Sequence, residues 1–358
     1  MREHGNGNTR CGWSRRDAES GAPWADEEQK LKRFLTETCL SGADCFGFSF
    51  RLILVEDVGL RSVELYCPAK LNLFLAITGC REDGFHELVS VAAQIDVGDK
   101  LTAQLTEGRD FQLRCDDPGV PVDDSNLVLR AANMFRERSD WTGSVAFDLQ
   151  KVTPMGAGLG GGSSDAVGAL KALNTLAGKR LPLATLRDIS AELGSDCPLF
   201  FEERPVVMRG RGERLVPLED HAATRIVGRE ALVVKPPFGV NTAWAYGRLA
   251  ANAPEDYLSE DRAERRLADW VGNTDGSPED LGYNSFAGPI GAKFVALPTM
   301  ARLIATQFDR KLHLSGSGSA CYVWIRDSKE RESIGRLVRE CWGPKTWIRS
   351  AKITGNVA

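Results

Sequence analysis

Apolar and polar residues follow two periodicities along the chain, and each predicts a type of secondary structure. Residues 145–152 alternate apolar and polar positions, which is typical of a half-buried strand. Apolar side chains recur with helical spacing over 164–176 and again over 183–193. The run over 63–77 is strand-like and almost entirely apolar. The pattern therefore predicts a chain that contains both strands and helices.

The segment between the predicted strand and the first predicted helix is rich in glycine. It runs from Pro154 to Asp165 and has five glycines in seven positions, followed by two serines. Glycine tolerates positive φ and lets backbone N–H groups approach a ligand closely. The start of the next helix adds unpaired N–H groups and the positive end of the helix dipole. The segment therefore predicts a loop that wraps a polyphosphate.

Three other interpretations compete for this loop. A structural turn without a ligand would not need five glycines, each of which costs conformational entropy. The spacing Gly156-x-Gly158-x-x-Gly161 also fits a dinucleotide-binding fingerprint, which needs an acidic residue at the end of a following strand. Residues 183–193 predict a second helix there instead. A Walker A loop is excluded because no Gly-Lys-Ser/Thr ends the segment.

Composition narrows the class of protein. The chain has 358 residues, enough for two domains, with 42% hydrophobic and 26% charged residues. Its net charge of −4 does not indicate the excess of basic residues that is typical of proteins that bind nucleic acid. Nine cysteines without a C-x-x-C pair favour reduced thiols in the cytoplasm. No apolar run approaches the length of a membrane span, and residues 1–60 are expected to be a disordered extension or sequence upstream of the true start.

Several polar residues interrupt apolar segments. Lys70 and Asn72 lie inside the 63–77 run, where a solvated lysine on an edge strand is the simpler alternative. A polar turn after Gly79 leads to Phe85 and His86, and a lone histidine is more often structural than catalytic. Asp196 lies between Gly194 and a proline that precedes an expected apolar strand over 199–201, and it could simply cap a turn.

A second small-residue loop lies near the C-terminus. It consists of Ser315, Gly316, Ser317 and Gly318, and a predicted strand over 321–325 follows it. Loops of this kind pack against a phosphate or against another loop.

Taken together, these segments resemble the GHMP kinase superfamily over residues 63–355. The resemblance is carried by Pro68 to Leu75, Asp83 to Leu88, Pro154 to Asp165, Leu193 to Pro198, Asn241 to Tyr246 and Ser315 to Gly318. It implies an α+β protein with a ribosomal protein S5 domain 2-like ATP-binding domain over 61–222 and a ferredoxin-like substrate domain over 223–358. A cleft is expected between them.

Within the superfamily, the strand that contains Lys70 and the turn that contains Gly84, Phe85 and His86 are most similar to members that act on a cytidine-diphosphate sugar alcohol. The resemblance implies transfer of the γ-phosphoryl of ATP to a tertiary 2-hydroxyl. Lys70 and Asp196 match the catalytic pair. Asp196 would accept the hydroxyl proton, and Lys70 would keep that carboxylate ionised and stabilise charge on the reacting oxygens. Another small-molecule GHMP kinase, or a nucleotide-binding sensor without catalysis, stays open as an alternative.

The resemblance also assigns binding roles. ATP would be held with Mg²⁺, with Ser163 and Ser164 offering hydroxyls to phosphate or metal, and with Asn126 near the nucleoside. His86 would read the cytosine, Tyr246 would stack on it, and Asn72 and Thr242 would lie near the sugar alcohol. The phosphate loop comprises Pro154, Gly156, Gly158, Gly160, Gly161, Gly162, Ser163 and Ser164.

The sequence departs from the superfamily pattern at several places. Phe85 stands where tyrosine is common, and Cys197 where an aliphatic residue is usual. Residues 255–280 are weakly similar, and no glutamate stands out as a Mg²⁺ ligand, so no protein-held metal is expected. The expected partner is a small molecule, without nucleic acid or membrane, for a chain that is a monomer or weak homodimer.

Overall fold

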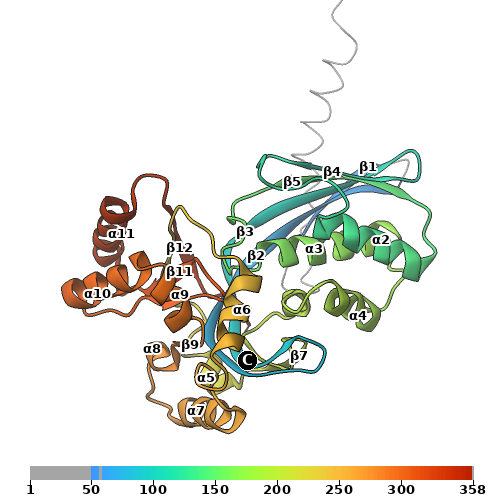
Figure 1. Cartoon of the computed structure of the whole chain (residues 1–358). Coiled ribbons are helices and arrows are strands. Elements are labelled where there is room, and N and C mark those ends of the chain that lie inside the picture. The colour runs from blue at the N-terminus through green and yellow to red at the C-terminus, as the bar shows by residue number, and fades with distance from the viewer. Residues whose placement is uncertain (1–49, 56–58, 357–358) are drawn as a thin grey trace, which may run out of the picture. The chain divides into compact units, whose positions relative to one another are not determined.

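Two β-sheets organise the part of the chain that the structure describes, which is residues 50–55 and 59–356 of a computed structural model (Figure 1). The larger sheet has the order β1-β2-β3-β5-β4, with β6 beside β3, β7 beside β6 and β9 beside β2. Its strands are β1 (Phe50–Val55), β2 (Gly59–Cys80), β3 (His86–Thr106), β4 (Phe111–Cys115), β5 (Ser144–Gln150), β6 (Val206–Arg209), β7 (Arg214–Pro217) and β9 (Tyr283–Asn284).

The hairpin of β2 and β3 is long enough to serve two parts of this sheet. β3 pairs with β5 over residues 100–106 and with β6 over residues 90–92. Between these regions the register with β2 shifts, because Pro68 faces Gly98 whereas Lys70 faces Gln94. A side chain at Gly98 would lie only 2.3 Å from the Cys67 carbonyl oxygen, so the close approach of the strands requires glycine there. Lys70 lies at this irregularity.

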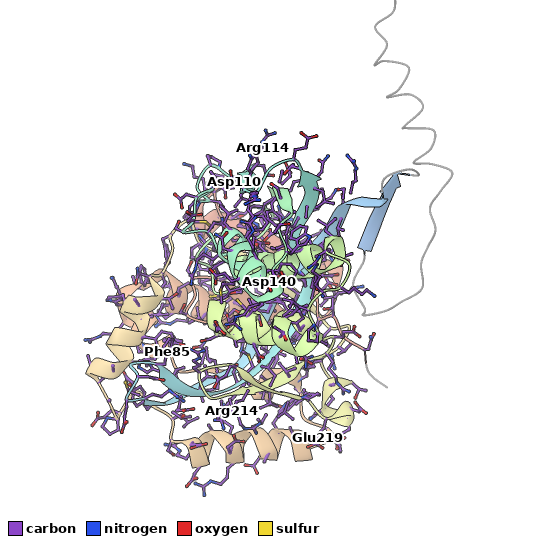
Figure 2. All side chains as sticks on the ribbon, turned by 90° about the vertical axis from the view of Figure 1, so that its right-hand side faces the viewer. Phe85, Asp110, Arg114, Asp140, Arg214 and Glu219 are labelled. Atoms are coloured by element: carbon purple, nitrogen blue, oxygen red, sulfur yellow. The ribbon has the colours of Figure 1, made fainter. Side chains whose placement is uncertain are left out.

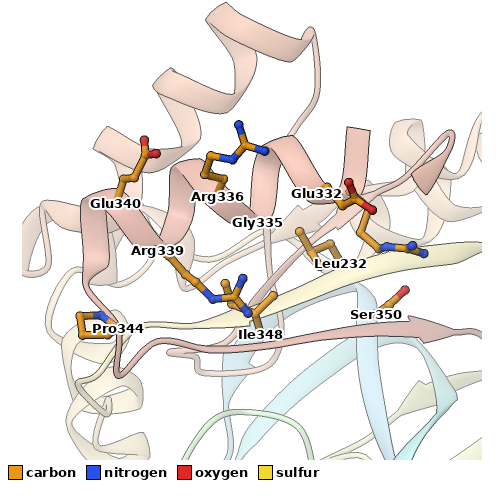
Figure 3. Close-up of a pocket in the computed structure, with 10 residues that line it drawn as sticks. Leu232, Glu332, Gly335, Arg336, Arg339, Glu340, Pro344, Ile348 and Ser350 are labelled. Atoms are coloured by element: carbon orange, nitrogen blue, oxygen red, sulfur yellow. The ribbon is translucent and has the colours of Figure 1, made fainter. Parts of the chain in front are cut away.

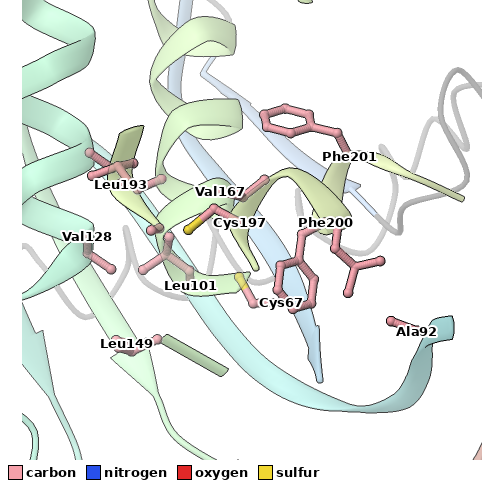
Figure 4. Packing of buried hydrophobic residues seen from close by; sticks show 14 of the residues in the cluster. Cys67, Ala92, Leu101, Val128, Leu149, Val167, Leu193, Cys197, Phe200 and Phe201 are labelled. Carbon is pink, nitrogen blue, oxygen red and sulfur yellow. The ribbon is translucent and has the colours of Figure 1, made fainter. Parts of the chain in front are cut away.

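Two helices cover one face of the large sheet, and a third packs against both of them (Figure 1). They are α2 (Leu127–Ser139), α3 (Gly161–Leu176) and α4 (Leu183–Leu193), and the last two agree with the sequence prediction. Because α4 follows α3 directly, the strand that a dinucleotide-binding unit needs is replaced by a helix. Figure 4 shows the core that these helices close, with Leu101 and Leu149 from the strands facing Val128, Val167 and Leu193 from the helices.

The smaller sheet contains β8 (Glu230–Lys235), β10 (His313–Leu314), β11 (Cys321–Trp324) and β12 (Trp347–Lys352). Its order β10-β11-β8-β12 is antiparallel throughout, and it is the 4-1-3-2 order of a ferredoxin-like sheet when read from β12. The remaining helices are α5 (Asp220–Ala223), α6 (Thr242–Ala251), α7 (Glu260–Gly272), α8 (Pro278–Leu281), α9 (Ala287–Lys293), α10 (Ala296–Phe308) and α11 (Ser328–Trp342).

Backbone contacts join the two sheets. Ile95 of β3 forms an isolated antiparallel bridge with Ile353, just beyond β12. The N–H of Thr354 donates to the Gln94 carbonyl at 2.9 Å. The two sheets therefore meet beside the register shift that contains Lys70.

Two expectations about secondary structure need correction. Residues 199–201 form part of a 3₁₀ helix, η1 (Cys197–Phe201), and not a strand. Its buried carbonyls are satisfied by side chains, because Gln94 donates to the Leu199 oxygen at 3.2 Å and Lys171 donates to the Phe200 oxygen at 2.6 Å.

The second correction concerns the expected extension over residues 1–60. Residues 50–55 form β1 and pair antiparallel with the beginning of β2, so the strands of the large sheet begin before residue 61. Residues 1–49 and 56–58 lie outside the described residues.

Candidate active site

Lys70 is buried where β2 meets the glycine loop. Its side chain is 2% exposed, and its backbone N–H donates to the Leu159 carbonyl at 2.9 Å. A Cβ at Gly160 would lie 3.0 Å from Cγ of Lys70 and 3.0 Å from Cζ of Phe200. The aliphatic stem of Lys70 therefore passes closely along the loop, and the alternative of a solvated edge lysine is excluded.

Asp196 meets the ammonium of Lys70. Its Oδ2 lies 3.3 Å from Lys70 Nζ, and its side chain is 40% exposed. Asp196 immediately precedes η1 but makes no side-chain capping bond to it. The carboxylate is therefore paired with the lysine and open to an incoming group, and the turn-capping alternative fails.

The glycine loop has the backbone that the sequence predicted. Gly156, Gly158 and Gly160 have φ of 59°, 77° and 69°, in the left-handed region that favours glycine. Gly160 is the N-cap of α3 and supplies no side-chain cap to its N-terminal N–H groups. A Cβ at Gly156 or Gly162 would meet nothing within 4 Å. These features leave a backbone surface with room for an anion at the positive end of α3.

The two serines after the glycines have different surroundings. Ser163 is partly exposed. Ser164 is 2% exposed, and its Oγ has no hydrogen-bond partner among the described residues. It lines a small internal space with Cys67, Lys171 and Phe200, so its hydroxyl is inside the protein. A contact from Ser163 or Ser164 to phosphate stays a prediction.

A buried charge cluster, which the sequence did not reveal, ties the two ends of the loop together. Lys151 Nζ lies 2.8 Å from Oδ2 of Asp165 and also binds Asp99. Asp99 Oδ1 accepts the backbone N–H of Thr153 at 2.8 Å and that of Val152 at 2.6 Å. All three charged side chains are 5% exposed or less.

Burial sets the acid–base properties of this cluster. It raises the pKa of Asp165 to about 7, although Lys151 acts against the shift. Burial also lowers the pKa of Lys151, but the charges of Asp165 and Asp99 outweigh it and the pKa lies above its usual value. The only signal in the sequence was that Lys151 and Asp165 flank the loop.

The C-terminal loop of small residues packs against the glycine loop. Packing against another loop is one of the two roles predicted for it. Ser315 Oγ donates to the Gly158 carbonyl at 3.0 Å and accepts the Asn72 N–H at 3.3 Å. The Ala320 N–H donates to the Ala157 carbonyl at 2.9 Å. Because a Cβ at Gly158 would lie 2.2 Å from the backbone carbonyl oxygen of Ser315, this contact needs glycine.

Two further predicted residues lie at this junction. Thr242 begins α6, and its Oγ1 lies 2.9 Å from Oγ of Ser317. Asn72 accepts a hydrogen bond from Lys70 Nζ through its Oδ1. Strand β2, the glycine loop and the C-terminal loop therefore meet at this junction.

The predicted base-recognition residues form an aromatic group. The rings of His86 and Tyr246 are 4.8 Å apart, and Phe286 lies 4.9 Å from Tyr246 on another side. Burial, with a smaller contribution from the charge of Asp196, raises the pKa of Tyr246, and burial lowers the pKa of His86. Phe85 is 46% exposed at the surface (Figure 2), and the Arg211 guanidinium lies 5.0 Å from its ring centre.

Asn126 has a structural role in the described contacts. It is the N-cap of α2, where its Oδ1 accepts the Val128 N–H at 2.9 Å and its Nδ2 donates to the Pro121 carbonyl at 2.6 Å. Both polar groups of the amide are therefore used within the protein, and a contact with a nucleoside stays a prediction.

Cys197, which follows Asp196 in the sequence, is fully buried in the core (Figure 4). Burial raises the pKa of its thiol to about 12. The side chain therefore acts as a small packing group.

A cavity of about 650 Å³ lies elsewhere, along α11 and β12 (Figure 3). Its lining includes Arg331, Arg336 and Arg339 but none of the candidate site residues. Among the residues that the structure describes, no three His, Cys, Asp or Glu side chains converge on a metal site. No helix in the described ranges is long and apolar enough to span a membrane.

The fold and the glycine-loop site are those of the GHMP kinases, and comparisons with known proteins agree. The family of GHMP kinases N terminal domains matches residues 126–201. A 4-diphosphocytidyl-2-C-methyl-D-erythritol kinase of Prochlorococcus marinus (strain MIT 9313) is 35% identical over 305 residues, or 82% of this chain and 94% of the relative. One of Protochlamydia amoebophila (strain UWE25) is 41% identical over 207 residues, or 58% of this chain and 69% of the relative.

Solved structures give the same result. The crystal structure of a 4-(cytidine 5'-diphospho)-2C-methyl-D-erythritol kinase has a TM-score of 0.64 and 30% identity, covering 81% of this chain and 99% of that chain. A homoserine kinase from Cytophaga hutchinsonii has a TM-score of 0.64 at 16% identity, covering 85% and 98% of the two chains, which shows the fold alone. The chain belongs to the 4-diphosphocytidyl-2-C-methyl-D-erythritol kinase family of the GHMP kinases. The expected two-domain α+β fold is thereby confirmed.

Proposed function

We propose that this chain transfers the γ-phosphoryl group of ATP to the 2-hydroxyl of 4-diphosphocytidyl-2-C-methyl-D-erythritol. The family membership supports the substrate, and the site supports the chemistry. The observation that carries the chemistry is the contact of Lys70 with both Asp196, at 3.3 Å, and the glycine loop. An acceptor alcohol at Asp196 would therefore face a triphosphate held by the loop. We retain the division into an ATP-binding part over 61–222 and a substrate part over 223–358 as part of this proposal.

The reaction needs a base, a held triphosphate and stabilisation of charge. The 2-hydroxyl oxygen attacks the γ-phosphorus, its proton passes to a carboxylate oxygen of Asp196, and the bond from the γ-phosphorus to the bridging oxygen of ADP breaks. Lys70 donates to the reacting oxygens and stabilises the negative charge that develops on them. Because Asp196 is already paired and oriented, little reorganisation is needed when the proton moves.

Mg²⁺ enters this proposal with ATP. A hard cation of this kind is commonly bound by substrate phosphates with one or two carboxylates. The described residues include no converging cluster of three metal-binding side chains, so they do not fit a cage that holds the ion without nucleotide. The chain's own contribution to phosphate binding is the loop backbone and the N-terminus of α3.

The aromatic group supports recognition of the cytidine end. His86 and Tyr246 contact one another, and the charge of Asp196 reaches Tyr246, so base recognition and catalysis would lie close together. Phe85 offers an exposed aromatic face without the hydroxyl that is common there. Base stacking tolerates this difference, because it depends on the ring face. We also propose a cytoplasmic location and a monomer or weak homodimer that binds no nucleic acid.

The deciding experiment is an assay of ADP release with a panel of acceptors. The full chain with ATP and Mg²⁺ should release ADP with the cytidylated methylerythritol substrate and not with homoserine or mevalonate. Turnover with homoserine or mevalonate alone would assign another kinase activity. No turnover with any acceptor, together with ATP binding by calorimetry, would indicate a nucleotide sensor.

A further inference from the structure

A chain of buried hydrogen bonds leads from the Lys70 ammonium into the middle of the large sheet. Lys70 Nζ donates to Asn72 Oδ1, and Asn72 Nδ2 donates to Ser90 Oγ at 2.9 Å. Ser90 Oγ then donates to the Phe74 carbonyl at 2.6 Å. Ser90 lies on β3, between Leu75 of β2 and Met208 of β6, and does not belong to the predicted site.

Each bond in this chain has only one possible direction. An ammonium has three donors and no acceptor, so the carbonyl side of the Asn72 amide must face Lys70. The amide nitrogen then faces Ser90 and needs an acceptor there. Because the single hydroxyl hydrogen of Ser90 is directed to Phe74, its oxygen is free to accept. Ser90 thereby satisfies the nitrogen end of the amide and holds it in place while the oxygen end faces the lysine.

The chain is isolated from solvent. Lys70, Asn72 and Ser90 are 2%, 5% and 0% exposed, so water does not replace a missing partner easily. Within such a low-dielectric interior, an unpaired amide donor is costly and a misdirected one repels the ammonium. The orientation of Asn72 therefore matters more here than it would at the surface.

We propose that Ser90 is a positioning residue for phosphoryl transfer, which acts by fixing the Asn72 amide that holds the Lys70 ammonium on Asp196. This inference rests on the proposed function. Without the Ser90 hydroxyl, the amide loses the partner of its nitrogen and can rotate, which brings a donor toward the ammonium. Lys70 would then shift away from the reacting oxygens while the glycine loop proposed to hold ATP stays in place.

The test is the kinetics of Ser90→Ala against a matched control. We expect kcat to fall about 10-fold, because a small displacement of a catalytic group costs one to two powers of ten in rate. KM for ATP should stay within about twofold, since a positioning defect acts mainly in the transition state. Ser144→Ala is the control, because Ser144 is also buried, accepts from Thr106 Oγ1 and donates to the Asp110 carbonyl, at the far end of β3. It should leave kcat unchanged.

A double-mutant cycle with Asn72→Ala separates positioning from general weakening of the fold. If Ser90 acts through Asn72, then Ser90→Ala should lower kcat by less than about twofold in the Asn72→Ala background. Independent, multiplying effects would overturn the inference, and so would equal kcat values for Ser90→Ala and Ser144→Ala. Failure of the unmodified chain to turn over the cytidylated substrate would instead refute the proposed function.

Discussion

At the scale of single residues, the site depends on a charge pair with unequal burial. Lys70 is almost fully enclosed, whereas Asp196 is partly open to solvent. An enclosed ammonium is tolerated because Asp196 and the Asn72 amide satisfy it. The open side of Asp196 leaves room for an alcohol, so the same pair can be both stable and reactive.

The first prediction concerns the proposed base. Asp196→Asn should lower kcat by about 10²-fold or more, because general base catalysis contributes about 10²–10⁴ and an amide does not accept the proton. ATP binding, measured by calorimetry, should remain. Asp188→Asn, at an exposed position of α4, is the matched control and should keep normal turnover. Unchanged turnover in Asp196→Asn would remove this residue from the mechanism.

The second prediction concerns His313, whose ring stacks 5.0 Å from that of Tyr322. Burial, with a smaller effect of Lys311, lowers the pKa of His313 to about 4. The unfolded chain therefore binds more protons between pH 4 and 6.5, and stability must rise with pH through that window. His313→Phe keeps an aromatic ring without the titration.

Urea unfolding at pH 4.5 and pH 7 measures this effect. The loss of unfolding free energy on acidification should be smaller in His313→Phe by about 2–3 kcal/mol. An equal loss in both proteins would show that His313 is not the group responsible.

At the scale of elements, the glycine loop is held from three sides. Lys70 and Phe200 lie against Gly160, the C-terminal loop lies against Gly158, and the buried cluster joins Lys151 to Asp165 across the ends of the loop. A glycine-rich segment alone would be flexible, because glycine loses much conformational freedom on ordering. These contacts supply the order that a preformed phosphate site needs.

The third prediction tests the buried cluster. Lys151→Met removes the cation between Asp99 and Asp165 and leaves two buried carboxylates without it, which should cost about 3–5 kcal/mol of unfolding free energy. KM for ATP should rise as well, because the ends of the loop are released. Lys100→Met is the control, since Lys100 pairs with Glu64 at 2.8 Å on the surface of the same sheet and should cost about 1 kcal/mol or less. Equal costs for both variants would contradict the role of the cluster.

At the scale of the whole described structure, the two sheets form a single functional arrangement. Lys70 lies on β2 of the large sheet, and the glycine loop follows β5 of the same sheet. Ser315 and Tyr246 come from the part of the chain that also forms the smaller sheet. The bridge between Ile95 and Ile353 fixes their junction. The proposed site therefore needs both sheets in place.

The fourth prediction tests this junction. Ile353 is 2% exposed, and Ile353→Ala should lower the unfolding free energy by about 2–5 kcal/mol through lost burial and a cavity. Val295→Ala is the control, because Val295 is 67% exposed and should cost within about 0.5 kcal/mol. Calorimetry should show one transition in the unmodified chain. Two separate transitions would show that the sheets unfold independently.

Predictions from the sequence were correct where residues close together in the chain decide the backbone conformation. The α3 and α4 helices and the left-handed glycines follow from spacing and residue type over a few positions. They failed at residues 199–201, where an apolar run forms η1 because distant side chains satisfy the buried carbonyls. They also missed Ser90 and Asp99, since nothing near either residue in the sequence marks its partners.

By itself, the sequence determined the glycine loop, its helix and the residue types available for acid–base chemistry, because short-range backbone preferences and side-chain identity are local properties. The resemblance to the GHMP kinases added the pairing of Lys70 with Asp196. Only the tertiary structure decided how that lysine is buried, which way Asn72 is turned, and which groups close the ends of the loop. Those features depend on contacts between segments that are separate in the sequence, such as Asn72 with Ser90 and Asn72 with Ser315. The physical reason is that burial and hydrogen-bond direction belong to the folded interior as a whole.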